Sequence, residues 1–413
     1  MISRFIYYEE QLEDGGIVAM RKIWGSKKIR TVALYILVVL LAISVIGTVA
    51  IASGESGVIK NAILISWDGV QRDHLRELLE TGSLPNLKGL IEEGTIVEID
   101  VTHKTDTKAG HAQMLTGYGP EVTGVYSNSV YQPIPKGYTI FERLEEAFGK
   151  DGIATIMITG KGGNLGSKGP SSEEPLITEL SRKQLEKKGV SRDQVLERLK
   201  KVFGDDNVGR AIISIITEAP SKALKKLSSG FLKSPEGMKV KRRLAMQSHR
   251  GEPFYNAKPA IDLFQGDKAR PADEVGKLAL DSLDQYGKGR FFAFFHFSDP
   301  DHAGHKYGEN SREYSDAIIA ADKWLGRIVQ KLKELGVYEE TRIYVTSDHG
   351  FDEGKTSHSM APYVFLATND PEIKRRGDQR DIVPTLLARM GFDISKVDPP
   401  LLGRLLTEPE KPW

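Results

Sequence analysis

The chain has 413 residues, enough to bury one large α/β core or two smaller ones, and its formal net charge is +1. Because the net charge is small and the basic residues do not alternate with aromatic ones, the sequence shows no nucleic-acid binding surface. The absence of cysteine excludes disulfides, thiolate zinc sites and a cysteine nucleophile, so any metal must be held by oxygen and imidazole ligands.

Residues 32–52 form a candidate transmembrane anchor. The run is uncharged and about 21 residues long, enough at about 1.5 Å per residue to cross a bilayer core of about 30 Å. Basic residues precede it and a nearly neutral flank follows, so the positive-inside rule predicts a cytoplasmic tail at 1–31 and an extracytoplasmic domain at 53–413. The alternative is a signal peptide that is cleaved near Ala52 and releases a secreted protein, because Ala50-Ile51-Ala52 has small residues at the required spacing.

From residue 62 to residue 158, short apolar runs alternate with helical patterns. Residues 62–66 are a continuous apolar run, which is typical of a strand buried on both faces of a parallel sheet. Further strands are expected at 96–101 and 152–158. Helices are expected at 73–81, from Leu84 to a C-cap at Gly94, from the segment 105–111 through Leu115, and at 140–148 with Thr139 as its cap.

Between about 162 and 289 the sequence changes character. It is rich in Lys, Glu, Ser and Gly, with helical patches at 191–203 and 273–286 and no buried-strand run, so we interpret it as an insertion or cap over the sheet. The alternation then resumes with strands at 290–297, 342–346 and 363–366 and helices at 311–335 and 381–390. This order predicts an α/β fold with a mostly parallel sheet and helices on both faces.

Aspartate and histidine side chains follow the apolar runs. Three of these runs lead into the aspartates Asp68, Asp301 and Asp348. Ligands of open α/β sheets bind at the C-terminal ends of the strands, so these carboxylates are expected in one crevice. Three histidines accompany them at His305, His349 and His358. Three acids and three imidazoles suit two metals with three protein ligands each, the arrangement that two-metal enzymes use in phosphoryl transfer.

An ordered set of motifs resembles the alkaline phosphatase superfamily, in particular its type I phosphodiesterases, nucleotide pyrophosphatases and cofactor-independent phosphoglycerate mutases. The set extends over most of residues 60–405 outside the insertion. It consists of Trp67-Asp68-Gly69, Leu84-Pro85-Asn86-Leu87, Thr107 with Gly110-His111, Thr116-Gly117, Pro120-Glu121, Pro300-Asp301 with Gly304-His305, Ser347-Asp348-His349-Gly350, His358 and the stretch 381–387.

The resemblance implies an alkaline phosphatase-like fold and a site with two divalent metals, zinc or manganese. One metal would be held by Asp301, His305 and His358, and the other by Asp68, Asp348 and His349. Thr107 would contact the second metal and act as the nucleophile through a phosphothreonine intermediate. The rival residues are Asp299 for Asp301 and Thr105 for Thr107, and both have the wrong spacing to the next motif residues. His111 and His296 are expected to have structural or supporting roles.

Several positions depart from the family pattern and leave the substrate open. Nucleotide pyrophosphatases tend to place an aromatic residue directly after the nucleophile and an Asn two positions later, whereas this chain has Lys108 and Gly110. Lys104 or Lys108 is a candidate phosphate contact, against the alternative of solvated lysines beside a cleft. The Cys/Ser-x-Pro-x-Arg motif of sulfatases does not occur near Thr107.

The sequence therefore predicts a membrane-anchored two-metal phosphohydrolase that acts on a small phosphodiester or phosphomonoester. The alternatives are a transferase that passes the phospho-group to another hydroxyl, and a non-catalytic binding protein with a structural metal site. The sequence indicates no oligomeric state.

Overall fold

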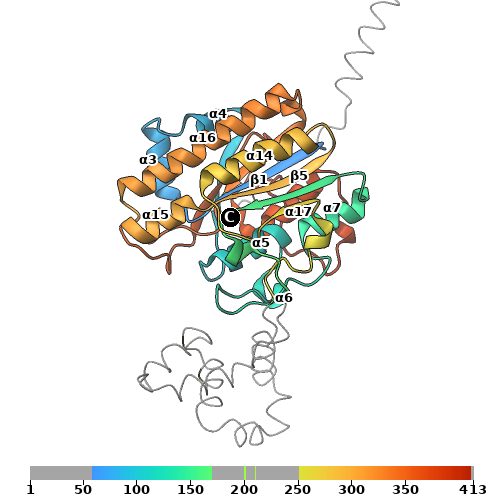
Figure 1. Cartoon of the computed structure of the whole chain (residues 1–413), viewed down its shortest axis with the longest axis horizontal. Helices are drawn as coiled ribbons and strands as arrows, with labels where there is room; N and C mark the ends of the chain where they lie inside the picture. The colour runs from blue at the N-terminus through green and yellow to red at the C-terminus, as the bar shows by residue number, and fades with distance from the viewer. Residues whose placement is uncertain (1–57, 170–199, 201–209, 211–250, 411–413) are drawn as a thin grey trace, which may run out of the picture. The chain divides into compact units, whose positions relative to one another are not determined.

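The computed structural model describes residues 58–169, 200, 210 and 251–410 (Figure 1). The candidate anchor at 32–52, the tail before it and the helical patch at 191–203, apart from Lys200, lie outside the described residues. Within the described ranges, no helix has both the length and the apolar character that a membrane crossing requires.

An eight-stranded sheet forms the centre of the molecule, in the order β4-β3-β5-β1-β6-β7-β2-β8. β1 pairs in parallel with both β5 and β6, whereas β7 pairs antiparallel with both β6 and β2. The expectation of a mostly parallel sheet is confirmed, with β7 running opposite to the others. The strands are β1 (Asn61–Trp67), β2 (Thr95–Asp100), β3 (Ala154–Thr159), β4 (Leu263–Gln265), β5 (Phe291–Phe297), β6 (Thr341–Thr346), β7 (Tyr363–Thr368) and β8 (Gly377–Asp378).

Helices cover both faces of this sheet, as Figure 1 shows. One face carries α3 (Arg72–Glu80), α4 (Pro85–Glu93), α14 (Ala272–Tyr286) and α16 (Arg312–Glu334), with α15 (Asp299–Tyr307) beside α16. The other carries α5 (Thr107–Thr116), α7 (Ile140–Phe148) and α17 (Ile382–Arg389). The short helices are α6 (Pro120–Thr123), α8 (Gly162–Leu165), η3 (Lys258–Ala260), η4 (Tyr338–Glu340), η5 (Gln379–Asp381) and η6 (Ile394–Lys396).

The apolar runs of the central strands explain this three-layer arrangement. Successive side chains on a strand point to opposite faces, so Phe291 and Phe295 pack into one core while Phe292 and Phe294 pack into the other. All four are fully buried, and each contributes roughly 1.5–3 kcal/mol through the burial of its ring. A continuous apolar strand is therefore what a sheet with helices on both faces requires.

Side-chain hydrogen bonds fix the starts of two helices, and the cap predicted at Thr139 is confirmed. Thr139 caps α7, accepting from Glu142 N at 3.4 Å, and the Glu142 carboxylate accepts from Thr139 N at 3.1 Å, which completes a capping box. At α4, the buried Asp322 of α16 accepts hydrogen bonds from the backbone N–H groups of Asn86 and Leu87, at 3.2 and 2.7 Å. The Leu-Pro-Asn-Leu motif is thus a helix start that is anchored to α16.

The second part of the expected insertion belongs to the core. Within residues 251–289, β4 pairs in parallel with β3, and α14 contributes Val275, Ala279 and Leu283 to the core over β3 and β5. The prediction of one insertion over 162–289 is therefore wrong at its C-terminal end. β4 has only three residues, all half-buried, so it lacks the continuous apolar run of a central strand.

Candidate active site

Asp68, Asp348 and His349 form a cluster that is closed to solvent, and we call it the closed half-site. All three side chains are fully buried. Asp68 directly follows β1, and Asp348 lies two residues beyond β6, so the parallel pairing of these strands brings the two carboxylates to the same edge of the sheet. His349 Nε2 lies 3.6 Å from Asp68 Oδ1 and 3.4 Å from Asp348 Oδ2.

Backbone groups hold the closed half-site in place. Gly69 adopts a left-handed conformation with φ of 73°, which turns the chain so that its N–H donates to Asp348 Oδ1 at 3.1 Å. The Gln379 side-chain amide donates to the backbone carbonyl of Asp348 at 2.8 Å.

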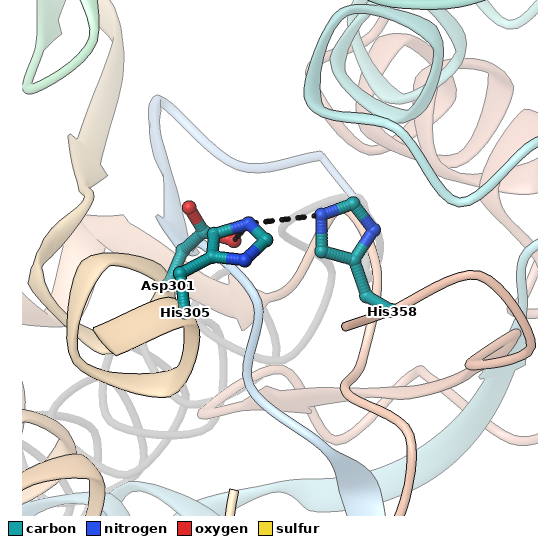
Figure 2. A group of neighbouring side chains, drawn as sticks. All are labelled: Asp301, His305 and His358. Atoms are coloured by element: carbon teal, nitrogen blue, oxygen red, sulfur yellow. Dashed lines mark hydrogen bonds and ion pairs between the residues drawn. The ribbon is translucent and has the colours of Figure 1, made fainter. Parts of the chain in front are cut away.

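Asp301, His305 and His358 form the open half-site (Figure 2). Asp301 lies in the first turn of α15, one turn after the end of β5, and His305 follows one helical turn later. His305 Nε2 lies 3.4 Å from Asp301 Oδ1 and 3.2 Å from His358 Nε2. The side chain of His305 is 46% exposed, whereas that of Asp301 is 4% exposed, so this half-site opens to solvent on its histidine side.

The two half-sites share a boundary. The His358 ring stacks on the His349 ring, with centroids 4.0 Å apart, and Asp301 Oδ1 lies 3.8 Å from His349 Nε2. Phe351 packs so closely against Gly69 and Gly304 that a Cβ atom on either glycine would lie within 2.8 Å of its ring. Gly69 and Gly304 therefore leave room for Phe351, so the loop after His349 packs against the segments that carry Asp68 and Asp301.

Thr107 is the first residue of α5, inside the segment 105–111 where the sequence predicts a helix to begin, and it is 2% exposed. Gly110, one turn later, approaches the Asp348 backbone so closely that a Cβ atom would lie 2.4 Å from its carbonyl oxygen. This contact places the start of α5 against the closed half-site. The rival Thr105 donates its hydroxyl to the His358 backbone carbonyl, so it supports the open half-site instead.

Four ligand atoms of the two half-sites are buried and unpaired. Asp68 Oδ1, Asp301 Oδ1, Asp348 Oδ2 and His349 Nε2 are buried without a hydrogen-bond partner among the described residues. His349 and His305 each use Nδ1 as a donor, to the carbonyls of Gly350 and Thr356, both at 2.9 Å. Their Nε2 lone pairs therefore face the carboxylates, which is the tautomer that a metal ligand needs.

The charge balance of the site also fits divalent cations. Burial opposes the ionisation of Asp68, but Lys161 and His296 outweigh it and hold the pKa of Asp68 well below its usual value. Burial and the nearby Asp68 raise the pKa of Asp348. Burial, helped by His349, lowers the pKa of His358 to about 4, so this imidazole is neutral at neutral pH. Burial opposes the protonation of His349, but Asp348 and Asp68 outweigh it and raise the pKa of His349. Crowded acids and the neutral His358 imidazole are donors for metals such as zinc.

Two further histidines support the site through its other side chains. His296 Nδ1 accepts from the Gly160 N–H at 3.1 Å, so its Nε2–H donates to Asp68 Oδ2 at 2.8 Å. His111 Nδ1–H donates to the Thr107 carbonyl at 2.8 Å, and its Nε2 accepts from the Ser66 hydroxyl at 2.9 Å. Both are fully buried and orient residues that face the half-sites.

All seven predicted site residues converge at one end of the sheet, but sequence reasoning missed Lys161. Its ammonium forms ion pairs with Asp68 Oδ2, at 2.8 Å, and with Asp301 Oδ2. Of the candidate phosphate contacts, Lys104 Nζ pairs with Asp106 at 3.4 Å, and Lys108 Nζ lies 4.3 Å from the centre of the Tyr131 ring. The only signal for Lys161 in the sequence was its position three residues after the end of the predicted strand 152–158, immediately after Gly160.

Carboxylates and imidazoles at the C-terminal ends of parallel strands, beside a threonine at a helix N-terminus, are groups that metal-dependent phosphoryl-transfer sites use. The chain belongs to the type I phosphodiesterase / nucleotide pyrophosphatase family, since the model of that family matches residues 62–393. The resemblance to the alkaline phosphatase superfamily is thereby confirmed.

Curated relatives include the bis(5'-adenosyl)-triphosphatase ENPP4 of Pongo abelii, which is 22% identical over 77% of this chain and 53% of its own length. The chain therefore spans about half the length of such relatives. A 2,3-bisphosphoglycerate-independent phosphoglycerate mutase of Clostridium kluyveri is 30% identical over 30% of this chain and 25% of its own. Among solved structures, alkaline phosphatase from the Antarctic bacterium TAB5 has a TM-score of 0.45 and 15% identity over 82% of this chain and 99% of its own.

Proposed function

We propose that this protein is a two-metal hydrolase of phosphodiesters or phosphomonoesters that uses Thr107 as its nucleophile. The observation that carries the proposal is the set of unpaired buried ligand atoms in the two half-sites, next to a threonine at the N-terminus of α5. Membership of the phosphodiesterase family supports the reaction class.

The two half-sites would hold two divalent cations, zinc or manganese. When bound, such cations lower the pKa of a hydroxyl or water and stabilise negative charge on a phosphoryl group. Asp68, Asp348 and His349 would hold the cation beside Thr107, and Asp301, His305 and His358 would hold the other. The carbonyls of Gly350 and Thr356 already fix the tautomers of His349 and His305. The ligand atoms of Asp301, His305 and His358 lie within 4.8 Å of one another, and so do those of Asp68, Asp301 and His349, a group that does not include Asp348.

The chain's own residues then perform two displacements at phosphorus. The Thr107 oxygen attacks phosphorus and the leaving alcohol departs on the opposite side, which gives a phosphothreonine. Water next attacks the same phosphorus, the bond to Thr107 breaks, and phosphate or a phosphomonoester is released. The dipole of α5 favours the negative charge of the phosphoryl group, since Thr107 lies at its N-terminus.

A transferase remains the second candidate. Any acceptor hydroxyl that fits the site could take the place of water in the second displacement, with the same residues and the same intermediate. The observation that favours it is the local similarity to phosphoglycerate mutases, in whose reaction a phospho-group is moved between hydroxyls.

The experiment is an assay of the full-length, detergent-extracted protein with p-nitrophenyl phosphate and bis-p-nitrophenyl phosphate, with and without a chelator. We expect turnover of at least one ester that is lost with chelator, recovers with Zn²⁺ or Mn²⁺, and falls in Thr107→Ala. Thr81→Ala is the matched control, because this threonine is exposed at the C-terminal end of α3, and its hydroxyl bonds only the backbone there and Ser83. Turnover that is insensitive to chelator would contradict the two-metal mechanism. If water hydrolyses neither ester but the phospho-group is transferred to an added alcohol, the result would favour the transferase.

We also propose that residues 32–52 anchor the protein and place its catalytic domain outside the cytoplasm. The support is the uncharged run itself and the basic residues before it. After fractionation, the protein should stay in the membrane pellet at alkaline pH, and protease added to sealed cells or spheroplasts should reach the domain. A soluble protein whose N-terminus begins just after Ala52 would instead establish a cleaved signal peptide.

A further inference from the structure

Lys161 lies inside the site although no motif includes it. It follows β3 and precedes α8, and its backbone is held by a bridge to Ala269. The preceding Gly160 donates to the His296 carbonyl at 3.0 Å and accepts from Arg270 N at 2.9 Å. The side chain is only 11% exposed, so the lysine is a fixed part of the site rather than a solvated surface group.

The lysine and the metal ligands use different oxygens of the same carboxylates. Lys161 Nζ contacts Oδ2 of both Asp68 and Asp301, so it joins the closed half-site to the open one. The Oδ1 atoms face imidazole nitrogens instead, His349 for Asp68 and His305 for Asp301. Because these Oδ1 atoms are the unpaired ones, Lys161 leaves the metal-facing side of both carboxylates free.

The Lys161 ammonium also approaches Thr107, the proposed nucleophile. An ammonium has three N–H donors, and two of them serve Asp68 and Asp301. Lys161 Nζ also lies 3.5 Å from Thr107 Oγ1, at the outer limit of a hydrogen bond. A phosphoryl group joined to Thr107 Oγ1 would carry its non-bridging oxygens two bonds beyond that atom, within reach of this donor.

We propose that Lys161 is a catalytic residue that holds a non-bridging oxygen of the phosphoryl group while Thr107 is attacking. This inference rests on the proposed phosphoryl-transfer function and adds a third cation, supplied by the chain itself, to the two metals. The hydrogen bond strengthens as negative charge builds on the phosphoryl oxygens, so it stabilises the transition state more than the ground state. Inorganic phosphate, the product of monoester hydrolysis, would bind to the same donor.

The alternative is a purely structural role, in which Lys161 acts as a brace that only keeps Asp68 and Asp301 together. The two roles predict different effects on metal binding. Removing a phosphate-contacting cation leaves the metals in place or tightens their binding, because a competing positive charge is lost. Removing a brace would loosen the carboxylates and lower the metal content. Metal stoichiometry therefore separates the two roles independently of turnover.

The test compares Lys161→Met and Lys161→Arg with the wild type in the full-length, metal-loaded protein. The measurements are metal content by mass spectrometry, the inhibition constant of inorganic phosphate, and kcat for p-nitrophenyl esters. For Lys161→Met we expect full metal content, phosphate inhibition weaker by about tenfold or more, and kcat lower by about a hundredfold. Lys161→Arg should recover part of both losses. Lys60→Met is the matched control, because this lysine pairs with Glu340 at the opposite end of β1.

Two results would overturn the inference. One is unchanged phosphate inhibition and kcat in Lys161→Met, and the other is a loss of activity that merely follows a loss of metal. If Lys161→Met does not fold, as judged by circular dichroism, Lys161→Gln takes its place in the same comparison. Should the wild type hydrolyse neither ester, phosphate binding to the metal-loaded protein, measured by calorimetry, still tests Lys161. Failure of the proposed function and failure of this inference are thus distinguishable.

Discussion

The two half-sites have the same kinds of ligand but opposite exposure. Asp68, Asp348 and His349 are fully buried, whereas the side chain of His305 in the open half-site is almost half exposed. The closed half-site adjoins the start of α5, so its burial keeps Thr107 and its ligands in one geometry. In the proposed mechanism, the open half-site would provide the side from which the leaving group departs and water enters. If Thr107 is the nucleophile, as we propose, the closed half-site would fix it in place while the open half-site exchanges with solvent.

Loss of one imidazole should therefore have a larger effect in the closed half-site. In His349→Ala a buried position loses a ligand that water cannot easily replace, and we expect kcat to fall by about 10³-fold or more. In His358→Ala solvent can enter beside His305, and we expect a fall of about 10²-fold with loss of mainly one metal. Steady-state kinetics and metal content per chain provide the comparison. Equal losses in the two variants would contradict the assigned difference.

Replacement of His296, which donates a hydrogen bond to Asp68, should have the next largest effect on activity. His296 donates to Asp68 Oδ2, so His296→Ala leaves that carboxylate oxygen with Lys161 as its partner. We expect metal affinity or kcat to fall by about 10- to 100-fold, which is typical for the loss of a residue that orients a metal ligand. Titration with Zn²⁺ in a competing chelator measures the affinity. His302→Ala is a suitable control, since this histidine is exposed on α15.

Metal release should occur in two phases. The open half-site is reached directly by solvent, so we expect a chelator to remove its metal at least about tenfold faster than the metal of the buried half-site. Stopped-flow fluorescence with a zinc indicator follows both phases. A single phase that releases both metals together would show that the half-sites do not differ in access.

Asp322 provides a comparison with the scaffold far from the chemistry. Its carboxylate accepts three hydrogen bonds from Asn86 and Leu87 at the start of α4. Asp322→Ala leaves backbone N–H groups without a partner and should lower the free energy of unfolding by about 1–3 kcal/mol. Urea unfolding measures this change. Activity should stay within about twofold of the wild type, and a larger loss would tie α4 to catalysis.

The central strands and the site were predictable because they depend on neighbouring parallel strands. β5, β1 and β6 are continuous apolar runs and lie side by side, so the residues after them converge. β4 was not predictable, because its three half-buried residues carry no such pattern. Lys161 was missed because a lysine after a strand is ordinarily solvated. Its role depends on β3 being next to β5, which the sequence does not reveal.

The stereochemistry at phosphorus tests the central claim, attack by Thr107, most directly. Each in-line displacement inverts the configuration, so attack by Thr107 followed by attack by water gives net retention. The measurement is the hydrolysis of a chiral phosphorothioate diester in ¹⁸O-labelled water, with the product configuration read by ³¹P NMR. We predict retention. Inversion would mean that water attacks the substrate directly and would contradict the phosphothreonine intermediate.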